Sequence, residues 1–373
     1  MKFKADRATL IKALAHIQSV AEKRNTIPIL ANARIEVARG KLTFTATDME
    51  IAVVEDVPAS ASRDGATTAP AATLYEIVRK LPEGAEVELD LDQEKQQLRL
   101  RAGKFATSLV TLPVDEFPAM TAGQLPHRFT LPALTLRALI DRTRFAISTE
   151  ETRYYLNGIY MHATPGPEGV LRAVATDGHR LARVEEPLPA GAAGMPGVII
   201  PRKTIAELRK LIDEVTEDVE IGLSDTRIQF RAGTVTLTSK LIDGTFPEYE
   251  RVIPRDNDKV LRVGKKDFSD AVARVAAISS ERSRPIKMSL APDLLTLSAA
   301  SPEQGTASEE LDSDHVTYGS APLEIGFQAR YLNDITDQIS GEVEFHFSDG
   351  AAPTVVRDAG DASALYVLMP MRV

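Results

Sequence analysis

The chain contains no cysteine and no tryptophan. Without cysteine it can form no disulfide, no thiolate metal site and no cysteine nucleophile. It also has no run of eighteen apolar residues, and its first seven residues, MKFKADR, lack the apolar stretch of a signal peptide. We therefore expect a soluble, cytoplasmic protein that does not enter a membrane.

Motifs for catalysis and for cofactor binding are missing as well. The Gly-Lys pairs at 103–104 and 264–265 lack the flanking residues of a phosphate-binding loop. Asp90 and Asp92 resemble the start of a calcium loop, but Lys95 and Arg101 occupy the positions that need Gly and Glu. The histidines stand singly, without metal-ligand spacing: His16, His127, His162, His179, His315 and His346. The sequence thus predicts no enzymatic activity, no metal and no cofactor.

What the sequence does contain is an internal repeat. Residues 42–48 (LTFTATD) match residues 171–177 (LRAVATD), and Phe117-Pro118 recurs as Phe246-Pro247 at the same offset. A weaker third copy lies at 295–301 (LTLSAAS), and an acidic residue follows the three copies at Asp56, Glu185 and Glu309. So long a period indicates domains with their own cores rather than solenoid repeats. The 373 residues divide into domains at 1–125, 126–256 and 257–373.

Each copy follows the same order of an amphipathic helix, alternating strands, a second helix and further strands. The apolar spacing predicts helices over residues 7–24, 73–80, 134–147, 202–213, 265–282 and 328–340. Strands are predicted over residues 86–91, 97–101, 219–223, 227–231, 235–239 and 343–347. The fold class is therefore α+β, with two helices per domain on antiparallel sheets.

The net charge of −9 argues against a nucleic-acid binder, but the charges are unevenly distributed. The six helical windows contain 18 Lys and Arg against 10 Asp and Glu, which leaves 26 against 43 for the rest. Lys and Arg are good helix formers, so the excess is explained equally by helix propensity or by helices that face phosphates. Phosphate contacts would bind DNA without reading its sequence.

Several longer motifs occur in one order along the whole chain: 26–30 (TIPIL), 81–85 (LPEGA), 153–158 (RYYLNG), 176–181 (TDGHRL), 200–203 (IPRK), 239–244 (SKLIDG) and 369–372 (MPMR). With them the chain resembles the bacterial DNA sliding clamp, the beta subunit of DNA polymerase III. The resemblance implies a processivity factor for DNA replication, formed by a head-to-tail homodimer that closes into a ring around duplex DNA. The helices would line the hole, and the sheets would form the outer surface.

The resemblance also implies a seam between the two copies. A first-domain edge strand with Phe105 and Leu109 would meet the third domain at Ala277, Ile278 and the segment after Ala300. Residues 103–107 (GKFAT) depart here from the more basic sequence of close relatives.

A further implication is a pocket between the second and third domains that receives short peptides, with a Gln followed by Leu and an aromatic residue, from polymerases, the clamp loader and repair proteins. Leu, Val and Met side chains suit such an adaptable apolar socket. The alternative is plain packing between domains, above all for Val367 and Met369. Ala351 and Pro353 replace the family's valine and serine near one wall. The implied pocket residues are Leu156, Thr176, Gly178, His179, Arg180, Leu181, Pro247, Arg251, Val252, Tyr331, Val367, Met369, Pro370, Met371 and Arg372.

For DNA, Arg24 matches a position that touches the duplex in the family; the alternative is a solvated loop arginine. Glu150 stands where a neutral polar contact is expected. Helix location alone adds the candidates Lys12, Arg137, Arg142, Lys203, Arg209, Lys210 and Arg274.

Two rival functions remain open at this point. The first is an enzyme, such as a nuclease, with Asp177, His179 and Arg180 as acid, base and phosphate clamp, although no nucleophile or second carboxylate lies nearby in sequence. The second is an interaction scaffold of the same fold that never encircles DNA. The excess of basic residues in the helices disfavours this scaffold.

Overall fold

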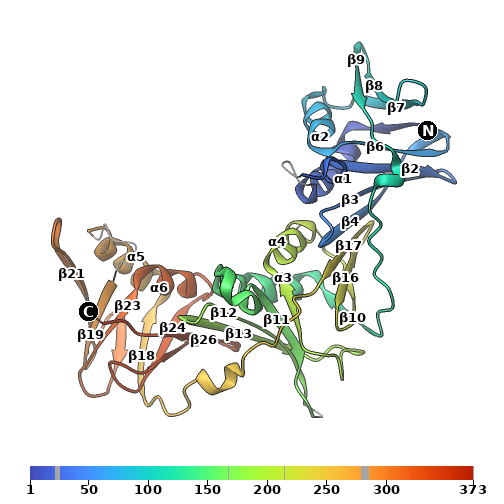
Figure 1. Ribbon diagram of the computed structural model, residues 1–373. Coiled ribbons are helices and arrows are strands. Elements are labelled where there is room, and N and C mark those ends of the chain that lie inside the picture. Colours follow the sequence, from blue (N-terminus) through green and yellow to red (C-terminus); the bar gives the residue numbers. More distant parts are fainter. Residues whose placement is uncertain (22–25, 167, 214, 279–284, 373) are drawn as a thin grey trace. The chain divides into compact units, whose positions relative to one another are not determined.

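The computed structural model describes residues 1–21, 26–166, 168–213, 215–278 and 285–372 (Figure 1). Each predicted helical window contains a helix, which confirms the helix predictions, although five windows extend too far at the C-terminal end. The first helix begins after Asp6, whose carboxylate accepts a hydrogen bond from the Thr9 amide at 2.9 Å. The helices are α1 (Arg7–Val20), α2 (Ala71–Lys80), α3 (Ala133–Asp141), α4 (Arg202–Leu211), α5 (Lys265–Ala276) and α6 (Ala329–Thr336).

The strands form four antiparallel sheets in the described residues, and all six predicted strands are confirmed to within one residue at each end. A five-stranded sheet has the order β5 (Ser60–Arg63), β1 (Lys2–Asp6), β7 (Glu86–Asp92), β8 (Gln97–Ala102) and β9 (Phe105–Val110). An eight-stranded sheet has the order β10 (His127–Pro132), β15 (Asp218–Leu223), β16 (Arg227–Ala232), β17 (Val235–Lys240), β4 (Ile51–Val57), β3 (Lys41–Thr47), β2 (Asn32–Ala38) and β6 (Gly65–Pro70).

The other two sheets contain the remaining strands. A nine-stranded sheet has the order β14 (Val198–Pro201), β11 (Gly158–Ala163), β12 (Val170–Thr176), β13 (Arg180–Pro187), β26 (Asp361–Leu368), β25 (Thr354–Asp358), β24 (Glu342–Phe347), β18 (Lys259–Gly264) and β22 (Val316–Tyr318). A four-stranded sheet has the order β21 (Gly305–Leu311), β20 (Leu294–Ser301), β19 (Pro285–Ala291) and β23 (Leu323–Gln328). With helices packed on antiparallel sheets, the predicted α+β class is confirmed.

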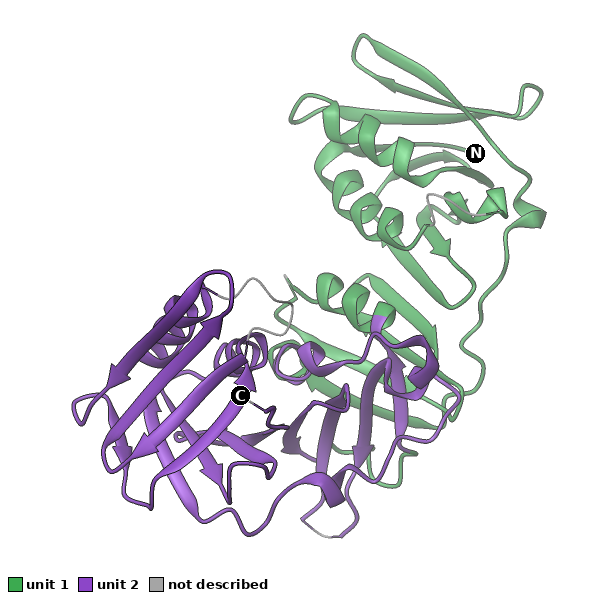
Figure 2. Cartoon of the chain, turned by 60° about the vertical axis from the view of Figure 1, so that its left-hand side comes forward, with its two compact units in different colours: residues 1–137, 189–196, 203–241 green, residues 138–188, 197–202, 242–373 purple. Residues whose placement is uncertain are grey.

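By contacts the chain forms two compact units, coloured separately in Figure 2. Unit 1 comprises Met1–Arg137, Pro189–Pro196 and Lys203–Leu241, and unit 2 comprises Ala138–Leu188, Gly197–Arg202 and Ile242–Val373. The segment predicted as the middle domain is shared between them, because β17 pairs with β4 in one sheet and β13 pairs with β26 in another. Sheet pairing therefore joins strands of different sequence repeats.

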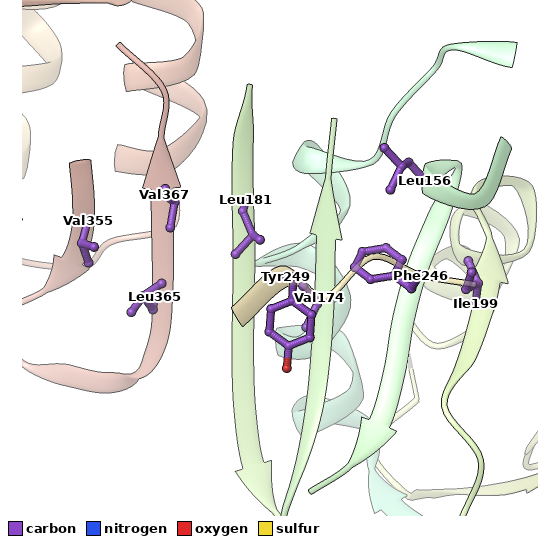
Figure 3. Close-up of a cluster of buried hydrophobic side chains, with 9 residues drawn as sticks. All are labelled: Leu156, Val174, Leu181, Ile199, Phe246, Tyr249, Val355, Leu365 and Val367. Atoms are coloured by element: carbon purple, nitrogen blue, oxygen red, sulfur yellow. The ribbon is translucent and has the colours of Figure 1, made fainter. Parts of the chain in front are cut away.

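Each unit buries the apolar side chains that the helix pattern predicts. In unit 1, α1 packs against α2 with Leu10, Leu14 and Ile17 almost fully buried. In unit 2, one cluster joins β12, β13, β25 and β26 to the segment around Phe246 and Tyr249 (Figure 3). No helix in the described part of the chain is long and apolar enough to cross a membrane.

Candidate functional site

A cavity of about 360 Å³ in unit 2 brings together nine of the fifteen predicted pocket residues. It is bounded by the β12–β13 turn, the end of β26, the 3-10 helix η4 (Glu151–Leu156) and the segment around the 3-10 helix η5 (Tyr249–Val252). The nine are Leu156, Thr176, Gly178, Arg180, Leu181, Pro247, Val252, Val367 and Met369.

The β12–β13 turn is fixed by its own polar side chains. The Asp177 carboxylate accepts hydrogen bonds from the amides of His179 and Arg180, at 2.9 and 3.0 Å. The Thr176 hydroxyl donates to the Arg180 carbonyl at 2.7 Å and accepts from the Gly178 amide at 3.1 Å. Gly178 has a φ of +89°, a left-handed conformation that glycine adopts without steric cost. These bonds hold the turn as one wall of the cavity.

Arg180 is the buried charge of this site, with only 4% of its side chain exposed. Its guanidinium contacts Asp177 at 3.1 Å and Asp334 at 2.5 Å, and it donates to the Phe145 carbonyl at 2.6 Å. It also lies 4.4 Å from the centre of the Tyr331 ring. Arg180 thus donates to two carboxylates and one carbonyl, and these contacts fix the position of the turn that carries it.

The apolar surface of the cavity belongs to a larger cluster. Leu181 and Val367 are register partners on β13 and β26, and Leu156 and Tyr249 extend the cluster (Figure 3). Met369 follows β26, and its amide donates to the His179 carbonyl at 2.9 Å. Met369 is 41% exposed, so the cavity has one apolar edge open to solvent, formed by an unbranched side chain that can adapt to a ligand.

Six predicted residues lie outside the lining of this cavity. Arg251 lines a neighbouring hollow, and the Tyr331 ring stacks beside that of His179 with centroids 6.3 Å apart. Met371 is held by a bridge to Gly326, and Pro370 and Arg372 belong to the same terminal segment. Ala351 and Pro353 do not line the described cavity either.

Four lining residues were absent from the predicted set: Arg153, Tyr155, Glu248 and Tyr249. The first two adjoin Leu156 in the RYYLNG motif, which was the available signal in the sequence. Arg153 donates to Glu150 at 2.8 and 2.5 Å, and this hydrogen bonding lowers the pKa of the Glu150 carboxyl. Glu150 is therefore an anion neutralised by its neighbour rather than a neutral polar contact.

The predicted DNA contacts fall into different environments. Arg24 lies outside the described residues. Arg142 corrects the expectation most clearly, because only 16% of its side chain is exposed and it pairs with Asp361 at 2.9 Å and Ser363 at 2.9 Å. Its guanidinium therefore binds side chains within unit 2.

The remaining predicted cations lie on helices with neighbours of their own. Lys210 pairs with Glu207 at 2.8 Å, Arg209 with Asp213 at 2.7 Å, and Arg274 with Glu309 at 2.5 Å. Lys203 pairs with Asp48, and Arg137 donates to the Asp213 carbonyl. Lys12 lines a cavity of about 540 Å³ in unit 1. Most of these cations therefore have a carboxylate or carbonyl partner within their own unit.

The predicted seam residues lie on the edge strand β9 and directly after helix α5. Phe105 and Leu109 are on β9, the last strand of the five-stranded sheet, where Phe105 is 45% and Val110 68% exposed. Ala277 and Ile278 follow α5, and β21 is the last strand of the four-stranded sheet.

The enzyme hypothesis finds no support in the site. Asp177 and Arg180 are engaged in holding the turn, and the described residues contain no group of three or more His, Asp or Glu side chains placed to hold a metal ion. The chemistry available at the cavity is therefore apolar contact edged by a few hydrogen-bonding groups.

Three family models together span almost the whole chain: the DNA polymerase III beta subunit N-terminal domain at residues 1–121, the central domain at 130–248 and the C-terminal domain at 250–372. The beta sliding clamp of Caulobacter vibrioides is 50% identical, with all of both chains covered. The crystal structure of the C. crescentus beta sliding clamp has a TM-score of 0.97 at 50% identity, covering 100% of this chain and 99% of that one.

A Bartonella birtlesii sliding clamp, solved bound to griselimycin, has a TM-score of 0.96 at 48% identity with both chains fully covered. Similarity of this extent, in sequence and in fold, spans all three repeats. The chain belongs to the family of the bacterial DNA polymerase III beta subunit, the beta sliding clamp.

Proposed function

We propose that this chain is a non-catalytic processivity factor, which encircles duplex DNA as a dimer in the cytoplasm and tethers polymerases through the cavity of unit 2. The observation that carries the proposal is the combination of a full-length family match with a cavity built from nine residues of the implied pocket. The bound griselimycin of the Bartonella birtlesii clamp supports a ligand-binding role for clamps of this family.

The proposed ligand is a short peptide with a Gln followed by Leu and an aromatic residue. Leu156, Leu181 and Val367 offer an apolar surface that is already assembled, so a peptide can bury its own apolar side chains without reorganising the core. Partners of this kind would include polymerases, the clamp loader and repair proteins. When the peptide extends beyond the cavity, we propose that it also contacts the predicted residues outside the lining, namely His179, Tyr331, Pro370, Met371 and Arg372.

We propose that the dimer forms where β9 of one copy meets β21 of the other. Both strands are sheet edges with unpaired backbone groups on one side in the described structure, and such edges are normally covered. Head-to-tail contact between two different edges closes into a ring when the rotation fits two copies. Phe105, Ala277 and Ile278 would be buried at this seam together with Leu109, which is already buried within one copy. Charge placed at Ile278 should weaken the dimer.

Direct affinity for linear duplex is proposed to be weak. The candidates Lys12, Arg137, Lys203, Arg209, Lys210 and Arg274, with Arg24, are basic, but most have acidic or carbonyl partners. Fewer free cations release fewer counterions, so binding should be modest and fall as salt rises. Retention on a circle, rather than affinity for a linear duplex, is the expected signature of encirclement.

The deciding experiment measures binding of a fluorescent Gln-Leu-aromatic peptide to the chain and to Met369→Ala, His179→Ala and a deletion of residues 369–373. Loss of one buried anchor commonly costs about 1 kcal/mol or more, or roughly fivefold in Kd. The deletion should abolish binding and polymerase stimulation. Dimer mass and melting temperature are measured in parallel, because the deletion removes the segment bonded to His179 and Gly326. Unchanged binding in all three variants with the dimer intact would place the peptide elsewhere.

A further inference from the structure

A second hollow of about 430 Å³ lies in unit 2 beside the peptide cavity. The two share Pro247, Glu248 and Tyr249 as lining residues, so this segment forms a common wall. We call the second one the aromatic hollow, after the rings of Tyr160, His162 and Tyr249 that line it.

The rings of the aromatic hollow are uncharged, and those of Tyr160 and His162 are stacked. Tyr160 lies between Phe246, at a centroid distance of 4.8 Å and an interplanar angle of 7°, and His162, at 4.9 Å and 27°. The His162 Nε2 atom is 2.9 Å from the Tyr249 hydroxyl, and burial holds the pKa of His162 below its ordinary value. The ring of His162 is therefore neutral near pH 7.

The charges at the rim are paired, with one exception. Glu248 pairs with Arg251, and Glu250 pairs with Arg172, which also binds Glu185 at 2.6 Å. Arg255 lines the hollow, is exposed, and forms no ion pair with any described residue. An unpaired guanidinium beside an aromatic surface offers two planar donors to a carboxylate.

We propose that the aromatic hollow binds the residues flanking the peptide motif, with an apolar side chain on the rings and a neighbouring carboxylate on Arg255. The inference rests on the proposed peptide function of the adjoining cavity. Two observations support the inference. The two hollows share a wall, which a peptide can cross in an extended conformation, and Arg255 forms no ion pair with a described residue. The occupant is thus an acidic extension of the partner peptide.

The test compares peptides that share the Gln-Leu-aromatic motif and differ in a Gly-Phe-X extension, placed at either end, with X as Asp, Ala or Lys. Binding to the full chain is followed by fluorescence anisotropy. At one end the Asp peptide should bind about 2- to 5-fold more tightly than the Ala peptide, as one exposed ion pair allows, and the Lys peptide more weakly. The advantage should shrink as salt increases.

Arg255→Glu should reverse the order, so that the Lys peptide binds more tightly than the Asp peptide. Arg101→Glu is the matched control, because Arg101 is an exposed arginine on β8 in unit 1, and it should leave the order unchanged. Melting temperatures check that both variants fold.

An Asp advantage absent at both ends, or one that persists in Arg255→Glu, overturns the inference while leaving the peptide cavity in place. Failure of the unextended motif peptide to bind the unaltered chain overturns the proposed cavity function and, with it, this extension.

Discussion

Two turns of the molecule have the same hydrogen bonds but different surroundings. In unit 1, Thr47 donates to the Ile51 carbonyl at 2.8 Å, and Asp48 accepts from the amides of Glu50 and Ile51 at 2.8 and 2.7 Å. In unit 2, Thr176 and Asp177 make the equivalent bonds. The third residue has a positive φ in both turns, +76° at Met49 and +89° at Gly178.

The difference lies in the residues placed on that shared backbone. The first turn carries Ile51, which is buried, where the second carries Arg180 with its two aspartates. Met49 projects from the first turn with 47% exposure, whereas a Cβ atom at Gly178 would lie 2.5 Å from the Arg153 guanidinium. The second turn, which lines the cavity, therefore differs from the first in two ways: its glycine leaves room for the Arg153 side chain, and its buried arginine pairs with two aspartates.

The largest effect should come from replacing Arg180 of the second turn with isoleucine, the residue that occupies the equivalent position, Ile51, in the first turn. Arg180→Ile would leave Asp177 and Asp334 without their buried partner, so we expect a loss of about 2–3 kcal/mol in the free energy of unfolding, measured by urea titration. Ile51→Val in the first turn, which removes one methyl group, should cost only about 1 kcal/mol. Equal costs for the two variants would contradict a supporting role for Arg180.

A smaller effect is expected from exchanging the third residue of the turns. Gly178→Met introduces a side chain at a positive φ and displaces Arg153, so stability should fall by about 1–2 kcal/mol and peptide affinity by at least about tenfold. Calorimetry and the peptide titration measure the two effects separately. Met49→Gly is the reciprocal change, and it should leave peptide binding as it is. Normal peptide affinity in Gly178→Met would show that peptide binding does not require a residue without a side chain at this position.

The smallest effect concerns an exposed contact of the first turn. Lys240 pairs with Glu50 at 2.9 Å, and both side chains are largely exposed. Lys240→Ala should therefore lower the free energy of unfolding, measured by urea titration, by no more than about 0.5 kcal/mol, and by less at high salt. A clearly larger loss would mean that the first turn, too, depends on a charged support.

The sequence predicted much of the local structure because the relevant interactions are between near neighbours. The apolar stripe of Leu10, Leu14 and Ile17 recurs at helical spacing, and the helix indeed buries all three. The helix ends were predicted less well. Residues 142–147 continue the apolar pattern past α3, but the Thr143 hydroxyl bonds back to the Leu139 carbonyl and the chain turns into the 3-10 helix η3 (Arg144–Ala146).

The candidate site was predicted in part, and its omissions share one cause. Motif resemblance supplied Leu156, Thr176 and Met369, which line the cavity. Tyr249 was missed because its place in the wall depends on how the segment after β17 lies against β12 and β13. Arg142 was misjudged for the same reason, since helix location does not reveal that Asp361, far along the chain, lies beside it.

By itself, then, the sequence determined three repeats, their six helices and six of their strands, because apolar spacing acts over a few residues. Only the tertiary structure decided that sheets run on from one repeat into the next, with β17 beside β4 and β13 beside β26. It also decided that Arg180 is paired and Arg255 is not. Such features depend on which strand or carboxylate from a distant part of the chain packs beside a given strand or side chain, and no pattern of neighbouring residues specifies that.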